Sequence, residues 1–165
     1  MPDLEPPDSH FASFAQGWLE LGNYTEAWHD LGRVSSDGCI HPDVLEVRWR
    51  LLAEQRRWAE ALDTARQLLA VAPENPISWI DQSFALHELR ETTEARAQLL
   101  TVVKRFPTVS TIPYNLACYS CQLGEFQESL DWLARAAVIA GKEEIKQMAL
   151  SDTDLKPLWP KIQKL

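Results

Sequence analysis

The pair of residues with the clearest potential for chemistry is Cys118-x-x-Cys121. Two thiolates three positions apart on a helix can chelate a metal ion or take part in redox exchange. A metal site needs further ligands, and the sequence has neither a second cysteine pair nor a neighbouring histidine. The sequence therefore favours packing roles for both cysteines, and we expect no metal and no cofactor.

The four histidines do not form a recognisable catalytic or metal-binding motif either. They are His10, His29, His41 and His87, and none shows a partner spacing such as His-Glu-x-x-His. The chain also lacks a G-x-S-x-G nucleophile motif, a phosphate-binding loop and a dinucleotide fingerprint, and it contains only 6 glycines. We therefore expect that the protein is not an enzyme.

Length and composition indicate a globular protein of one domain. The chain has 165 residues, of which 45% are hydrophobic and 24% are charged, so it can bury a core. An excess of 24 acidic over 16 basic residues leaves a net charge of −8, which would repel the phosphates of nucleic acids. The first residues have neither a basic region nor an apolar run, so we expect a cytoplasmic protein without membrane insertion.

The charges are unevenly distributed along the chain. Residues 1–32 contain six acidic side chains and no lysine or arginine, whereas residues 48–66 contain five arginines. Solvated helix faces explain such runs most simply. The alternative is that the acidic N-terminal end docks on a basic partner, or on the arginine-rich face of a second copy.

A period of 34 residues organises the chain. Small residues recur at this interval, at Ala27, Ala61, Ala95 and Ser129. An apolar residue follows each of them at the fourth and seventh position, which is the spacing of one helix face. A turn-like segment precedes each small residue and divides every period into two helices.

This pattern resembles the tetratricopeptide repeat (TPR) family, whose 34-residue motif combines W-x2-L-G-x2-Y, A-x3-F and a proline. The first helix of the first period matches with Phe11-x2-Phe14-Ala15-x2-Trp18. The second period is degenerate, because Arg48 and Trp49 stand where the family has leucine-like and small residues. Its helix packing must therefore differ from the consensus.

The resemblance implies an all-α fold, a solenoid of four helix-turn-helix repeats of the bacterial type. The predicted organisation is an extended tail at 1–7, repeats at 8–41, 42–75, 76–109 and 110–143, and a C-terminal capping helix and tail at 144–165. The second helix of the first repeat should end about a turn early. By family register, Trp18, Trp58 and Trp79 fall at core positions.

In this family the first helices line a concave groove that binds peptides. Read onto this sequence, the predicted peptide-binding residues are Arg50, Glu54, Ile80, Asp81, Phe84, His87, Tyr114, Asn115 and Cys118. Large apolar side chains at such positions are not needed for helix pairing, and an asparagine there often holds the ligand's main chain in this family. Binding is one explanation, and burial under a C-terminal segment of the same chain is the other.

The groove positions also predict the chemistry of the ligand. The family's carboxylate clamp is missing, because no lysine occupies a groove position, while Glu46, Glu54 and Asp81 make the central surface acidic. A basic or apolar segment would be attracted and a free carboxylate repelled.

The function predicted from these observations is a non-catalytic adaptor or scaffold that binds a peptide or protein segment. The alternative is a small chaperone resembling the repeat-containing chaperones of type III secretion. Those proteins usually carry an amphipathic helix before the first repeat, and Pro2, Pro6 and Pro7 disfavour one here. Nothing in the sequence defines the oligomeric state.

Overall fold

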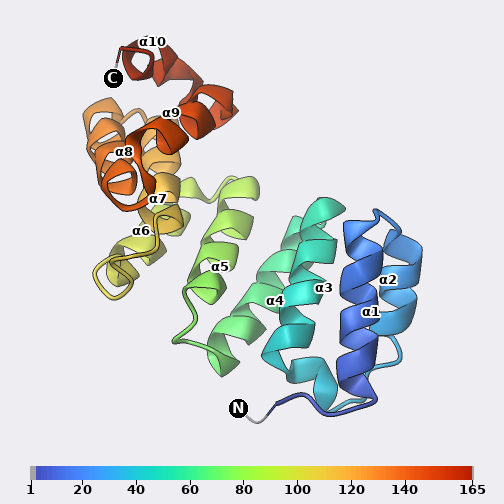
Figure 1. Cartoon of the computed structure of the whole chain (residues 1–165). Helices are drawn as coiled ribbons and strands as arrows, with labels where there is room; N and C mark the ends of the chain where they lie inside the picture. Colours follow the sequence, from blue (N-terminus) through green and yellow to red (C-terminus); the bar gives the residue numbers. More distant parts are fainter. Residues whose placement is uncertain (1–2, 165) are drawn as a thin grey trace. The chain divides into compact units, whose positions relative to one another are not determined.

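A computed structural model describes residues 3–164, which fold into helices joined by short turns, with no strand among them (Figure 1). The chain forms two compact units, residues 1–85 and 86–165, and their border lies inside one helix. No helix within the described part is long and apolar enough to cross a lipid bilayer.

The first unit consists of two helical hairpins and the helix that follows them. Its elements are α1 (Asp8–Glu20), α2 (Tyr24–Leu31), the short 3-10 helix η1 (Gly38–Ile40), α3 (Pro42–Glu54), α4 (Trp58–Val71) and most of α5 (Pro76–Glu88). The hairpins pair α1 with α2 and α3 with α4, and α3 also packs against α1 (Figure 1).

Local sequence signals explain where these helices begin and end. The Asn23 side chain accepts a hydrogen bond from the backbone N–H of Glu26 at 3.3 Å and caps α2. The His41 ring caps α3, whose first residue is Pro42. As predicted, α2 is short and ends at Leu31. The turn between α1 and α2 needs the left-handed backbone of Gly22, with φ of 71°.

The small residues of the 34-residue period mark the closest helix contacts in both units. Ala27, Ala61, Ala95 and Ser129 are each 0% exposed. In the second unit the Ser129 hydroxyl also donates a hydrogen bond to the Ala117 carbonyl of the facing helix at 2.7 Å. A larger side chain at these positions would separate the paired helices, so the period has a direct physical basis.

The second unit surrounds the almost fully buried helix α7. Its elements are the end of α5, then α6 (Thr92–Val102), α7 (Thr111–Gln122), α8 (Phe126–Ala140), α9 (Lys142–Ser151), the 3-10 helix η2 (Thr153–Leu158) and α10 (Trp159–Ile162). Helix α7 packs against α6 and α8, α9 packs on α8, and η2 folds back onto α7.

The tryptophans at predicted core positions are less buried than expected. Trp18 is 36% exposed, and its indole N–H donates to the Asp30 carboxylate at 3.0 Å. The prediction of a core role for Trp18 is therefore wrong. Trp18 lines an open hollow beside α2 instead of the interior of the helix pair. Trp58 and Trp79 are half-buried.

Candidate functional site

The first unit carries an acidic face between α3 and α5, formed by Glu46 and Arg50 of α3 and by Ile80 and Asp81 of α5. Glu46 and Arg50 are four residues apart and therefore share one side of α3. Asp81 is only 8% exposed, Glu46 and Ile80 are half-buried, and Arg50 is exposed. We call this surface the α3–α5 acidic face.

The two carboxyl groups of this face have raised pKa values. Burial is the main cause that raises the pKa of Asp81 to about 8, the negative charge of Glu46 adds to the shift, and Arg50 opposes it. Burial also raises the pKa of Glu46, although the Asn75 side-chain amide donates a hydrogen bond to it at 2.9 Å. Asp81 is therefore mostly protonated at neutral pH.

This arrangement leaves the α3–α5 acidic face short of positive charge. Arg50 is the one cation in the described part of the chain whose charge lowers the pKa of Asp81, and this arginine is exposed. A second cation placed near Asp81 and Glu46 would favour ionisation of both carboxyl groups. The face can therefore receive a lysine or arginine side chain from outside.

The aromatic residue of this region plays a different role from the predicted one. Phe84 packs edge-on against Trp49, with ring centroids 6.4 Å apart, and against Trp58 at 5.6 Å. These contacts fix α5 on the hairpin of α3 and α4. Phe84 is thus half-buried as a packing residue, and the prediction of a free apolar anchor is corrected accordingly.

Glu54 does not join the α3–α5 acidic face. It is exposed at the C-terminal end of α3, where its carboxylate accepts a long hydrogen bond of 3.5 Å from the Tyr24 hydroxyl of α2. Of the first-unit residues predicted from the sequence, the structure therefore groups Arg50, Ile80 and Asp81.

In the second unit, the chain's own C-terminal segment covers most of the predicted site. The Tyr114 hydroxyl donates to the Asp152 carboxylate at 3.0 Å, and the Cys118 thiol lies 3.4 Å from the same oxygen. The His87 ring meets the Asp154 carboxylate at 3.0 Å.

Tyr114, Cys118 and His87 are buried as a result, so they do not line an open groove. The structure thus corrects the prediction that they face a ligand, and the alternative considered from the sequence describes them. Asn115, next to Tyr114 on α7, stays half-exposed.

The cysteines of α7 sit in surroundings that keep them protonated. Burial, followed by the charge of Asp152, raises the pKa of the Cys118 thiol well above its usual value. Burial also raises the pKa of Cys121, and both cysteines are free thiols. Thiolate chemistry at neutral pH is therefore disfavoured. Within residues 3–164, no cluster of three or more potential metal-binding side chains occurs.

The predicted peptide-binding residues do not include Glu46, Asn75, Asp152 and Asp154. Glu46 was recognisable, because it holds an acidic groove position four residues before Arg50. Asn75 was not, since its role depends on how the turn before α5 places its amide. The two aspartates follow α9, and only a fold-back of that segment brings them to α7.

Comparison with known proteins supports a repeat architecture. No family model matches the chain. The translocation protein SEC72 of Saccharomyces cerevisiae is 36% identical over 74 residues, which are 44% of this chain and 38% of that protein. The chain thus spans well under half the length of this relative.

Solved structures match over nearly the whole chain. The structure of MamA from Desulfovibrio magneticus RS-1 has a TM-score of 0.73 and 16% identity, covering 99% of this chain and 97% of that one. The crystal structure of a thermophilic TPR protein from Thermus thermophilus has a TM-score of 0.70 and 16% identity, covering 96% of this chain and 100% of that one.

The chain has the TPR fold. In TPR terms, α3 and α5 are the first helices of two successive repeats. After the last helix pair, α9 packs on α8, and η2 lies against α7.

Proposed function

We propose that this protein is a non-catalytic adaptor that binds a segment of another protein on the α3–α5 acidic face. The bound segment carries a lysine or arginine next to an apolar side chain. The observation that supports the proposal is the buried Asp81 carboxyl group beside Glu46, with one exposed arginine as its cationic neighbour.

A buried acid of this kind costs folding free energy that a hydrophobic residue would not. Residues with strongly shifted pKa values are concentrated at functional sites, because binding or catalysis needs them. A ligand cation would add a second positive charge next to Asp81, beside the exposed Arg50. Ile80, adjacent to Asp81 and half-buried, provides apolar surface for the ligand's neighbouring side chain.

The overall charge and the comparisons agree with this role. The net charge of −8 attracts a basic segment during diffusion. The similar segment in yeast belongs to a protein named for translocation rather than for a reaction, which agrees with a non-catalytic role for this chain. The extended surface of a helical-repeat fold suits the binding of a peptide segment.

Selection from a phage library of random dodecapeptides on the immobilised protein tests the proposal. We expect the selected sequences to be enriched in lysine or arginine beside leucine, isoleucine or phenylalanine. Asp81→Asn should weaken their binding at least about tenfold, because the peptide's cation would lose its charged partner.

Asp63→Asn is the matched control, since this exposed aspartate of α4 pairs with Arg66 away from Asp81, and it should leave binding unchanged. Enrichment of acidic peptides, or equal binding to wild type and Asp81→Asn, would refute the proposed site.

A further inference from the structure

Two surfaces outside the α3–α5 acidic face expose large apolar side chains. The first, which we call the N-face, lies on α1 and α2 of the first unit. Phe14, Trp18 and Leu21 of α1 and the following turn are 55%, 36% and 76% exposed there. They line a shallow hollow together with Glu26 of α2. Monomeric proteins seldom leave bulky side chains grouped in this way without a partner.

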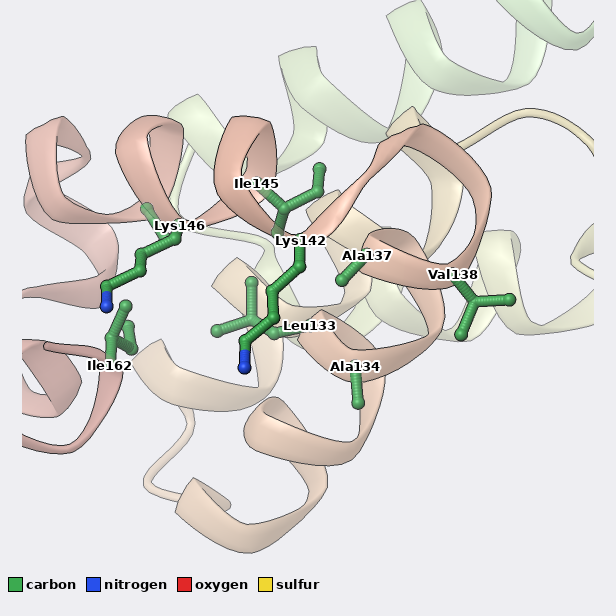
Figure 2. Close-up of a pocket in the computed structure, with 9 residues that line it drawn as sticks. Leu133, Ala134, Ala137, Val138, Lys142, Ile145, Lys146 and Ile162 are labelled. Atoms are coloured by element: carbon green, nitrogen blue, oxygen red, sulfur yellow. The ribbon is translucent and has the colours of Figure 1, made fainter. Parts of the chain in front are cut away.

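The second surface, the C-face, is an apolar hollow of about 300 Å³ between α8 and α9 of the second unit. Figure 2 shows Leu133 and Ala137 of α8 around it, together with the side chains of Lys142, Ile145 and Lys146 of α9. Val138, near the end of α8, also lines the hollow and is 87% exposed.

The internal repeat explains why the C-face is open. Helix α8 lies against α7 and is tied to α6 by the ion pair between Arg96 and Glu128. Helices α8 and α9 pack together, as α6 and α7 do, and the hollow between them has room for the side chains of a further helix. In the described part of the chain, the four-residue α10 reaches the hollow through Ile162.

The spacing on α9 fits this interpretation. Lys142, Ile145, Lys146 and Ala149 line the hollow at the first, fourth, fifth and eighth positions of one helix stripe. Such a stripe is the surface that a helix presents to a packed neighbour. The C-face therefore has the geometry of a helix-binding groove.

The charges of the two surfaces are complementary. The charged side chains that line the C-face hollow are Lys142 and Lys146, and five of the six lysines of the chain lie within residues 142–164. In the N-face hollow, Asp30 pairs with Arg33 at 3.2 Å and lies 3.7 Å from His29, and Glu26 is the other acidic side chain of the lining. Up to residue 32 the chain contains no lysine or arginine.

We propose that the C-face of one copy binds the N-face of a second copy. Phe14 and Leu21 of the second copy fill the hollow between α8 and α9, and its Glu26 pairs with Lys142 or Lys146. The two surfaces differ, so the contact is heterologous and joins copies head to tail. This self-association involves none of the residues of the α3–α5 acidic face and does not depend on the proposed function.

Sedimentation velocity with two blocked variants tests the proposal. Phe14→Glu with Leu21→Glu blocks the N-face, and Val138→Glu with Lys142→Glu blocks the C-face; all four residues are exposed, so the fold is retained. The wild type should show an average mass that rises with concentration above the 18.8 kDa of one chain. Each variant alone should stay at that mass.

The decisive measurement is an equimolar mixture of the two variants, because each still offers one intact surface. It should give a species of twice the monomer mass that does not grow further. Phe126→Glu, which alters an exposed apolar residue outside both surfaces, should assemble like the wild type.

Higher salt should weaken the association, since charge pairs at the edge are screened. A wild type that stays monomeric up to about 1 mM, in the range of the weakest specific contacts, would overturn the proposal. So would assembly that persists in either blocked variant, or a mixture in which the two variants do not combine.

Discussion

Asp81→Asn should stabilise the protein by about 3 kcal/mol at pH 8 and by less than about 1 kcal/mol at pH 4. Asp81 has a pKa of about 8 in the folded chain, compared with a usual value of 3.8. Between pH 4 and pH 8, the folded state therefore holds a proton that the unfolded state has already released. A shift of this size corresponds to at most about 6 kcal/mol, and rearrangement and water entry reduce it.

The sign of this effect follows from proton binding. Because the folded-state pKa is raised, the stabilising contribution of protonated Asp81 is fully present below pH 4 and is lost as the pH rises through 8. Asparagine does not ionise, so the variant keeps its stability across this range. The difference between variant and wild type should grow with pH and become constant above pH 8.

Urea unfolding of wild type and Asp81→Asn between pH 4 and pH 9 measures this difference. Asp63→Asn serves as the control, because it makes the same change at an exposed aspartate of α4. A free-energy difference of the same size at all pH values would show that Asp81 ionises normally in the folded protein.

The second large effect concerns the segment that covers α7. Asp152→Ala should destabilise the docking of this segment by about 2 to 4 kcal/mol. The carboxylate accepts hydrogen bonds from the Tyr114 hydroxyl at 3.0 Å and from the backbone N–H of Asp154 at 2.9 Å, and it also contacts the Cys118 thiol. Alanine removes all of these interactions and leaves the tyrosine hydroxyl without this partner.

The rate of thiol labelling measures how often the C-terminal segment detaches from α7. In a Cys39→Ser background, Cys118 and Cys121 are the remaining cysteines, and both are buried. Asp152→Ala should increase their rate of reaction with a disulfide reagent at least about tenfold, because the segment opens more often and the charge next to Cys118 is lost. Asp131→Ala, at an exposed position of α8, should not change the rate. Equal labelling rates in wild type and Asp152→Ala would contradict the role given to Asp152.

The helical hairpins could be predicted because single small residues determine where the paired helices can approach each other. Ala27, Ala61, Ala95 and Ser129 are completely buried where paired helices approach each other, so a fixed interval of small residues is a direct record of the packing. The short α2 was predictable for a similar reason, since the polar, glycine-containing stretch around Gly38 cannot continue a helix.

The candidate site was less predictable because it depends on contacts between distant residues. Trp49 stands where the TPR motif has a small residue, and its ring meets Phe84, which turns a groove position into a packing position. Tyr114 looked like an exposed aromatic anchor, but Asp152, 38 residues later, folds onto it. The sequence showed the acidic character around Asp81, and only the structure shows how deeply that carboxyl group is buried beside Glu46.

In the proposed complex, Asp81 and Glu46 receive a cation from the bound protein segment. Isothermal titration calorimetry at pH 7 tests it most directly, with a selected lysine-containing peptide and two buffers of different ionisation enthalpy. Since Asp81 is protonated in the free protein and ionised next to the peptide's cation, wild type should release close to one proton per complex, and Asp81→Asn should release none. Binding of the same peptide to wild type without proton release would contradict the account.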